Sequence, residues 1–334
     1  MVSVFSVKLV EGDHFGAEPG EPILQAALRA GINLNYSCRT GRCSACKCKL
    51  ISGATTAQHP ELGLTDQEKT DGWILSCVRT PDSDVTVEAQ TLGAIALPAA
   101  KTVPCRVAEI VRIAPDVVQV FLRVPPSARF EFLPGQYIDV IGPGGERRSY
   151  SLANANADNH VLELQVRFVE GGVMSRYWFH QAKVNDLLRL HGPLGTFFLR
   201  DSVNTDVYFL ATGTGIAPVK AMLMSMASLP QDQRPKSVTV LWGGRALQDH
   251  YFDVSALPGT HVYMPVLSRP EADWNGAKGY VQDVLLRLNP DLDNAVVYAC
   301  GSDAMIHSAQ ARLTDAGLSP ERFHSDAFVC SGTI

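Results

Sequence analysis

The sequence lacks long uncharged segments, internal repeats, low-complexity tracts and any surplus of basic residues. One of its longest uncharged segments, residues 207–219, is too short and too rich in glycine to cross a bilayer. The N-terminus has no basic region followed by an apolar run, so no signal peptide is expected. With 29 Lys and Arg against 34 Asp and Glu, the formal net charge is −5. We therefore expect a cytoplasmic protein that binds neither nucleic acid nor a membrane.

The 334 residues exceed what one hydrophobic core usually serves, and three segments differ in pattern. Residues 1–92 combine the strand-like SVFSVKLV and DVTVEA with a helix over GEPILQAALRAGINL, which is typical of a small α+β domain. Residues 93–101 are rich in alanine and are expected to be a linker. Residues 102–199 carry short strands such as VVQVFLRV and VLELQVRFV, which favour an antiparallel barrel or sandwich. Residues 200–334 alternate apolar strands with helical stretches, which predicts an α/β domain with a parallel sheet.

Cysteine is the unusual component, because half of the eight cysteines fall within the stretch YSCRTGRCSACKCKL. Without a secretory signal they favour metal or redox chemistry over a disulfide framework. Four follow C-x4-C-x2-C with a distant fourth, the spacing of plant-type [2Fe–2S] clusters: Cys38, Cys43, Cys46 and Cys77. Two sulfide-bridged irons need four thiolates, and a tight loop supplies three of them only if its backbone bends sharply. Gly41 permits such a bend, and the small Ser44 and Ala45 avoid clashes with the sulfides.

A structural zinc site is the alternative, because it also takes four cysteines. Zinc sites usually use two short-spaced pairs, and Cys77 has no such neighbour. We interpret Cys48 as a packing residue, because in a strand its side chain alternates away from that of Lys47. Cys105 and Cys330 are most simply small apolar residues or surface thiols.

A [2Fe–2S] cluster takes one electron at a time and cannot accept a hydride, so a second redox group is expected. RRSYSLAN, residues 147–154, precedes VRFVEGGVMS, residues 166–175. In such a pattern the arginine can neutralise a pyrophosphate, the aromatic side chain two residues later can cover a flavin face, and the hydroxyl that follows can hydrogen-bond the flavin ring. Residues 172–175 can open a helix whose free N–H groups face phosphates. Alone, this pattern also fits an ordinary strand with exposed arginines.

The third segment contains two turns of the kind that holds a dinucleotide. VYFLATGTGIAPVKAML predicts a strand, a glycine turn and a helix beginning near Pro218, where a parallel-sheet domain binds a dinucleotide phosphate. It lacks the full G-x-G-x-x-G, so a tight turn without a ligand stays open. YACGSDAMI repeats the arrangement, with Cys300 and Gly301 at the end of a strand.

Taken together and in order, LPGQY, RSYS, GPLGTFF, GTGIAP and YACG resemble the ferredoxin–NADP reductase superfamily. With the cysteine loop, all 334 residues resemble the iron–sulfur flavoprotein reductases whose domains follow the order ferredoxin, FAD, NAD. Within that group, RRSYSLAN, GPLGTFFLRD, FLATGTGIAPVK, VYACGSDAMI and FHSDAFV are most similar to the CDP-6-deoxy-3,4-glucoseen reductases. YSCRTGRCSACKC and DAF also resemble reductases of ring-hydroxylating dioxygenases. Thr212 departs from the glycine common in relatives, which would alter how closely the nicotinamide nucleotide approaches.

The resemblance implies roles for residues of the flavin segment. Arg148 would contact the FAD pyrophosphate, Tyr150 would stack on the isoalloxazine, and Ser151 would lie near its reactive N5. Val166 would approach the flavin nucleotide through its backbone. Four consecutive residues would hold the flavin phosphates: Gly172, Val173, Met174 and Ser175.

It also implies roles in the last segment. Four residues of the glycine turn would form the nicotinamide nucleotide site: Gly213, Thr214, Gly215 and Pro218. Cys300 and Gly301 would lie close to the hydride transfer. Phe328 would cover the flavin on its nicotinamide side, and the alternative is a core phenylalanine.

The implied activity is electron transfer from NADH through FAD and a [2Fe–2S] cluster to a separate protein. One resemblance makes that protein a pyridoxamine-phosphate, iron–sulfur dehydrase of CDP-3,6-dideoxysugar synthesis, and the other makes it an oxygenase component. A stand-alone flavin reductase of small acceptors is a further alternative. NADPH stays open, because Arg245 follows a strand where a 2′-phosphate could sit, whereas Asp249 would repel it.

The cysteine loop is locally basic. Residues 36–50 carry four basic side chains and no acid: Arg39, Arg42, Lys47 and Lys49. Residues 1–92 as a whole carry eight basic and eleven acidic side chains, so the positive charge of the loop is opposite in sign to the net charge of its segment. Either the loop is solvated and its charge incidental, or it steers an acidic partner toward the cluster.

Overall fold

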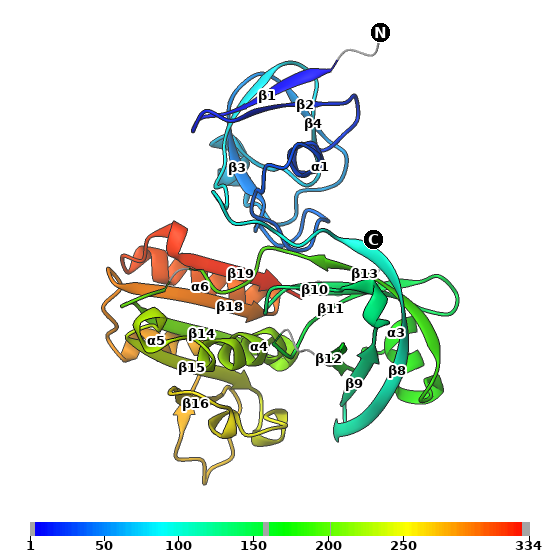
Figure 1. Cartoon of the computed structure of the whole chain (residues 1–334). Helices are drawn as coiled ribbons and strands as arrows, with labels where there is room; N and C mark the ends of the chain where they lie inside the picture. The colour runs from blue at the N-terminus through cyan, green and yellow to red at the C-terminus, as the bar shows by residue number, and fades with distance from the viewer. Residues whose placement is uncertain (1–3, 156–159, 201, 329–334) are drawn as a thin grey trace. The chain divides into compact units, whose positions relative to one another are not determined.

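The computed structural model describes residues 4–155, 160–200 and 202–328. The chain divides into two compact units, residues 1–97 and residues 98–334 (Figure 1). In the described ranges no helix is long and apolar enough to span a membrane. Cys330 lies outside the described residues.

The first unit is a mixed five-stranded sheet with a helix that contributes to its core. The strands follow the order β2-β1-β7-β3-β5, and β1 pairs antiparallel with β2 and parallel with β7. The helix α1, which lies within the predicted stretch GEPILQAALRAGINL, buries Ile23 and Ala27. This is the predicted α+β architecture. Its elements are β1 (Phe5–Leu9), β2 (His14–Ala17), α1 (Ile23–Arg29), β3 (Lys47–Ser52), β4 (Thr55–Ala57), α2 (Asp66–Thr70), β5 (Trp73–Leu75), β6 (Arg79–Pro81) and β7 (Val85–Glu88).

The second unit begins with a closed antiparallel sheet. Six strands follow the order β11-β10-β13-β8-β9-β12. A bridge between Leu152 and Leu164 joins the two outer strands, so the sheet closes into a barrel and the sandwich alternative is excluded. The interior is apolar, and β12 contributes Leu162, Leu164 and Val166 to it. The elements are β8 (Lys101–Ala114), β9 (Val117–Arg123), β10 (Tyr137–Ile141), β11 (Arg147–Ser151), β12 (Val161–Arg167), α3 (Val173–Arg176), a π-helical turn (Tyr177–Gln181) and β13 (Leu187–Leu194).

The same unit continues as a six-stranded parallel sheet, here called the nucleotide lobe, in the order β17-β16-β15-β14-β18-β19. All its pairings are parallel, as the alternation of strands and helices predicts. The elements are β14 (Asp206–Thr212), α4 (Ile216–Ala227), β15 (Ser237–Gly244), β16 (Val262–Leu267), β17 (Ala277–Lys278), α5 (Val281–Arg287), β18 (Ala295–Gly301), α6 (Asp303–Asp315) and β19 (Phe323–Ala327).

The strand order places the two predicted nucleotide turns side by side. From β14 the chain runs outward through β15, β16 and β17, then returns to β18 on the other side of β14. Ala211 pairs with Cys300, so both strands end at the same edge of the sheet. Open parallel sheets bind ligands at such a reversal of strand order. The fold therefore brings the GTG turn and the YACG turn to one crevice.

Candidate functional site

The four cysteines of the plant-type pattern lie together as two thiol pairs. Three come from the loop before β3, and Cys77 follows β5. The Cys38 side chain hydrogen-bonds that of Cys43, and the Cys46 side chain hydrogen-bonds that of Cys77. Two pairs suit a centre of two irons, each of which takes two thiolates. Among the described residues, no three His, Cys, Asp or Glu side chains are grouped as for a single metal ion.

The loop favours the thiolate form of one member of each pair. The hydrogen bond from Cys43, with contributions from the Thr40 side chain and backbone, lowers the pKa of Cys38 to about 5. The hydrogen bond from Cys46 lowers the pKa of Cys77 in the same way. The Thr40 N–H donates to Cys38 Sγ over 3.4 Å, and the Cys38 N–H donates to Cys43 Sγ over 3.3 Å. Backbone N–H groups directed at sulfur are what an iron–sulfur centre requires, so the donor set fits the cluster. The ligand assignment itself stays a prediction.

A buried ion pair that the sequence analysis missed supports this loop. Glu61 Oε1 accepts the Leu75 N–H over 2.7 Å, and Glu61 Oε2 accepts Arg79 Nε and Nη2 over 3.0 and 2.7 Å. The turn after Glu61 contacts the cysteine loop, where the Gly63 N–H donates to Gly41 O over 2.9 Å. A Cβ on Gly41 would lie 2.7 Å from the Pro60 carbonyl oxygen, so this position needs glycine for space as well as for its φ of 75°.

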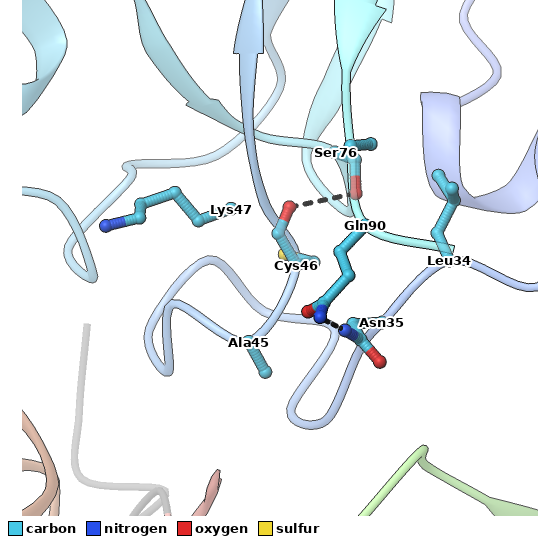
Figure 2. Close-up of a pocket in the computed structure, with 8 residues that line it drawn as sticks. Leu34, Asn35, Ala45, Cys46, Lys47, Ser76 and Gln90 are labelled. Atoms are coloured by element: carbon cyan, nitrogen blue, oxygen red, sulfur yellow. Dashed lines mark hydrogen bonds between the residues drawn. The ribbon is translucent and has the colours of Figure 1, made fainter. Parts of the chain in front are cut away.

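A small pocket adjoins the loop beside Cys46 (Figure 2). The Ser76 hydroxyl donates to the Cys46 carbonyl oxygen over 3.1 Å, and Asn35 Nδ2 donates to Gln90 Oε1 over 2.6 Å, as Figure 2 shows. These bonds fix the two segments that carry cysteines of the pattern. The lining residues are Leu34, Asn35, Ala45, Cys46, Lys47, Ser76, Ala89 and Gln90.

The basic side chains of the loop differ in their surroundings. Lys47 Nζ lies 2.8 Å from Glu68 Oε1 and 4.8 Å from the centroid of the Trp73 ring, which Lys49 also approaches. Arg39 is exposed and donates to Gln25 Oε1 over 3.2 Å. The charge of Lys47 is therefore matched within the unit, whereas that of Arg39 faces solvent.

The remaining described cysteines of the first unit and the barrel lie in apolar cores. Cys48 on β3 is 1% exposed, and burial raises the pKa of its thiol to about 12. Cys105 on β8 is 2% exposed, and burial raises its pKa to about 12 as well. Cys48 thus agrees with its interpretation as a packing residue, and Cys105 is the small apolar residue of its two alternatives, not a surface thiol.

The predicted flavin residues of RRSYS lie on β11. Tyr150 is partly buried, its hydroxyl accepts the Trp178 Nε1–H over 3.1 Å, and burial raises its pKa. The buried Ser151 donates its hydroxyl to Asp326 Oδ2 over 3.3 Å. Arg148 lies two residues before Tyr150 on the same strand, and therefore on the same face as Tyr150. The sequence analysis missed Asp326, although it lies within the FHSDAFV motif.

The predicted flavin phosphate turn begins a short helix. Gly172 precedes α3, and a Cβ there would lie 2.7 Å from Ser175 Oγ. Ser175 Oγ donates to Val169 O over 2.8 Å, which closes the turn. Met174 is buried in the barrel core, whereas Val173 is 63% exposed. Val166, on β12, is buried in the same core. The glycine cradle fits a phosphate group, and the individual roles stay predictions.

The predicted nicotinamide nucleotide turn follows β14. Residues Gly213–Gly215 form a 3₁₀ turn, and α4 begins at Ile216, two residues before the predicted start. Pro218 lies in the first helical turn, where its missing N–H costs no hydrogen bond. Position 215 needs glycine, because a Cβ there would lie 2.2 Å from the Cys300 carbonyl oxygen. The two turns thus touch, and their bare backbone fits the close approach of a dinucleotide.

Thr212, which stands where the resemblance leads one to expect glycine, links the GTG turn to the YACG turn. Its Oγ1 accepts the Ser302 N–H over 3.3 Å. A Cβ on Gly301 would lie 2.0 Å from the same oxygen, and Gly301 has a φ of 151°. The threonine therefore occupies the space beside Gly301 at the nucleotide crevice.

The other residues predicted near hydride transfer lie at the end of β18 and β19. Cys300 is fully buried in the core of the nucleotide lobe, and burial raises the pKa of its thiol far above the usual value. Phe328 packs partly buried against that core, and its N–H donates to Gly301 O over 2.8 Å. This packing agrees with the alternative of a core phenylalanine, and its role over the flavin stays a prediction.

Two further contacts that the sequence analysis missed join the barrel to the nucleotide lobe. Lys220 on α4 reaches both carboxylate oxygens of Glu163 on β12 at 2.6 Å. Arg167, at the end of β12, has Nη1 2.9 Å from where a Cβ on Gly213 would lie. Strand β12, which carries the predicted flavin contact Val166, is thus also in contact with the nucleotide turn.

Comparison with known families assigns each part of the chain. Residues 9–82 match the 2Fe-2S iron-sulfur cluster binding domain, residues 104–199 the oxidoreductase FAD-binding domain, and residues 209–311 the oxidoreductase NAD-binding domain. These matches confirm the predicted fold classes and the predicted cofactors, FAD, a [2Fe–2S] cluster and a nicotinamide nucleotide.

Curated relatives match this chain over nearly their whole length. The chain is 40% identical to the CDP-6-deoxy-L-threo-D-glycero-4-hexulose-3-dehydrase reductase of Yersinia pestis, over 95% of this chain and 96% of that one. It is 31% identical to terephthalate 1,2-dioxygenase reductase component 1 of Comamonas, over 96% and 95%. Amycolatopsis cytochrome P450 reductase GcoB superposes with a TM-score of 0.75 and 29% identity, over 98% of this chain and all of that one. The chain therefore belongs to the iron–sulfur flavoprotein oxidoreductases that join a [2Fe–2S] domain, an FAD-binding barrel and an NAD-binding domain for electron transfer.

Proposed function

We propose that the chain transfers electrons from NADH, through FAD and the [2Fe–2S] cluster, to an iron–sulfur dehydrase that acts on a CDP-linked 6-deoxyhexulose. The contact that supports the route is the hydrogen bond between Ser151 and Asp326, because it joins the predicted flavin strand β11 to β19. β19 pairs with β18, which ends at the nucleotide crevice. The 40% identity over nearly the whole chain supports the choice of acceptor. A cytoplasmic location belongs to this proposal, since thiols stay reduced there.

The protein's part in the chemistry is to bind and orient. FAD, when bound, supplies the step from a two-electron hydride to single electrons, which no side chain here can perform. Arg148 would hold the pyrophosphate, and Tyr150, fixed by Trp178, would lie against the flavin ring. Asp326 would orient the Ser151 hydroxyl at the place where hydride arrives.

The loop after β15 supports NADH as the donor. Asp249 Oδ2 accepts the N–H groups of Arg245 and Ala246 over 2.6 and 3.1 Å. Two backbone donors that would otherwise suit a 2′-phosphate are therefore already bound to a carboxylate. An acid near this strand end is also what a ribose 2′-hydroxyl prefers.

The partner can be identified by direct reduction. The purified protein is mixed anaerobically with NADH and with either a CDP-6-deoxyhexulose 3-dehydrase and its sugar nucleotide or an aromatic-ring dioxygenase component. We expect turnover of the sugar nucleotide to depend on this chain, at a rate well above that with the dioxygenase component. Faster reduction of the dioxygenase component would favour an oxygenase system. Equal turnover on quinones without any partner would favour a stand-alone reductase.

A further inference from the structure

Strand β12 contacts both the barrel core and the nucleotide lobe, because successive side chains of a strand point to opposite faces. Leu162, Leu164 and Val166 face the barrel interior and lie in its core. Glu163 and Gln165, which alternate with them, are each only 6% exposed. Polar residues on the outer face of a barrel strand would ordinarily be solvated. Here Lys220 and Tyr251 of the nucleotide lobe contact them, and Figure 1 shows the helix α4 next to β12.

Glu163 is bound from both sides of the junction. Its Oε1 and Oε2 each accept Lys220 Nζ over 2.6 Å, and Gln119 on the neighbouring strand β9 donates to Oε1 over 2.7 Å. The Lys220 side chain is 15% exposed and that of Glu163 is 7% exposed. An ion pair so far removed from solvent is not the loose surface contact that contributes little.

Gln165 makes the second contact across the junction. Its Oε1 accepts the Tyr251 hydroxyl over 2.8 Å. Tyr251 stacks edge-on against Trp242 with a centroid distance of 5.0 Å, and Trp242 Nε1 donates to Gly213 O over 3.0 Å. Gly213 is the first residue of the predicted nucleotide turn, and Lys220 lies in the helix that follows this turn. Both contacts therefore connect β12 to the same turn.

We propose that Glu163 and Gln165 are positioning residues: through Lys220 and Tyr251 they hold the nucleotide turn in register with the predicted flavin residues of the barrel and so set the distance for hydride transfer. This deepens the proposed function and rests on it. Hydride transfer requires the nicotinamide carbon and the flavin nitrogen that exchange the hydride to approach within van der Waals contact, and a misplacement of 1 Å can cost on the order of a hundredfold in rate. A strand that carries Val166, a predicted backbone contact of the flavin, and whose outer face binds the nucleotide turn provides that register directly.

The test uses the full-length holoenzyme and separates positioning from stability. Lys220→Met leaves a buried carboxylate without its cation, so this variant should lose both stability and rate. The double variant Glu163→Gln/Lys220→Met removes both charges, which often restores stability, yet it leaves the register unfixed. Glu163→Lys/Lys220→Glu restores an ion pair, since the neighbouring glutamine amides can turn to accept from a lysine. Asp283→Asn, which breaks the ion pair of Asp283 with Arg312 inside the nucleotide lobe, is the matched control.

The readouts are the anaerobic rate of flavin reduction at saturating NADH and the long-wavelength charge-transfer absorbance of the reduced flavin with NAD⁺. We expect the double variant to bind FAD normally, with a reduction rate lowered about tenfold or more and a weakened charge-transfer band. The charge-swapped variant should recover much of both, and Asp283→Asn should match the wild type. Tyr251→Phe should show the same loss in milder form, which provides a test even if a charge variant fails to fold.

A double variant with the wild-type rate and charge-transfer band would overturn the proposal and leave the pair a purely stabilising contact. The proposal would also be overturned if the rate of flavin reduction followed thermal stability strictly across all variants. Failure of the wild type itself to be reduced by NADH would instead refute the proposed function, so the two failures are distinguishable.

Discussion

The buried ion pair beneath the cysteine loop gives the most direct test of how the cluster unit is held together. The Glu61 side chain is 4% exposed and that of Arg79 is 23% exposed, and two hydrogen bonds of 3.0 and 2.7 Å join them. Arg79→Met would leave a buried carboxylate without its cation, which typically costs about 3–5 kcal/mol. For a unit of this size, 1 kcal/mol corresponds to about 4–8 °C in Tm, so the lower estimate predicts a fall of at least about 12 °C.

The assay is the loss of visible cluster absorbance on heating at a fixed scan rate, with flavin release followed in the same sample. Arg29→Met is the matched control, because the pair of Arg29 with Glu21 lies in the same unit but Arg29 is 46% exposed. Such a pair contributes about 1 kcal/mol or less. Glu61→Gln/Arg79→Met should recover part of the loss, since an amide oxygen at position 61 can still accept the Leu75 N–H. If Arg79→Met and Arg29→Met lower the cluster midpoint equally, the ion pair is not what holds the loop.

Four further outcomes are expected. Serine in place of Cys38, Cys43, Cys46 or Cys77 should abolish or impair cluster binding, judged by iron content and visible spectrum. Cys48→Ser should keep the cluster. A fragment of residues 98–334 should bind FAD and reduce ferricyanide with NADH but fail to reduce the protein partner; full partner activity would show that the cluster is not the exit. Asp249→Ala should narrow the preference for NADH over NADPH about tenfold in kcat/KM, because it frees two backbone donors; an unchanged ratio would place the selection elsewhere. Arg39→Asp should slow partner reduction and weaken its salt dependence at full cluster content; unchanged kinetics would make the loop charge incidental.

Much of the fold follows from local patterns, and the differences have identifiable causes. The helix predicted near Pro218 begins at Ile216 because the glycine turn before it is itself helical and runs directly into α4. A barrel and a sandwich present the same alternation along each strand, so strand patterns left both open. The choice depends on one pairing between Leu152, directly after β11, and Leu164, in the middle of β12, and these two strands lie at opposite ends of the strand order.

The candidate site divides in the same way between local signals and long-range partners. Spacing alone identified four cysteines that lie together in the structure, since the chemistry of a cluster restricts how far apart its ligands lie. The partners that position the site are remote in the sequence: Ser151 and Asp326 are separated by 175 positions, and Glu163 and Lys220 by 57. A carboxylate in a sequence carries no mark of the group that will bind it, so these pairs were not predicted.

Strand β12 shows why alternation alone is ambiguous. In VLELQVR, polar Glu163 and Gln165 alternate with apolar residues, which ordinarily indicates one face in the core and one in water. The structure confirms that the apolar residues lie in the core. The polar residues do not face water, because Glu163 and Gln165 are each 6% exposed. Burial of such groups is tolerated only where each hydrogen bond lost to water is replaced, and Lys220, Gln119 and Tyr251 provide those replacements. The polar face of this strand is therefore an interface that requires particular partners, which is the property needed to hold two cofactor sites in a fixed register.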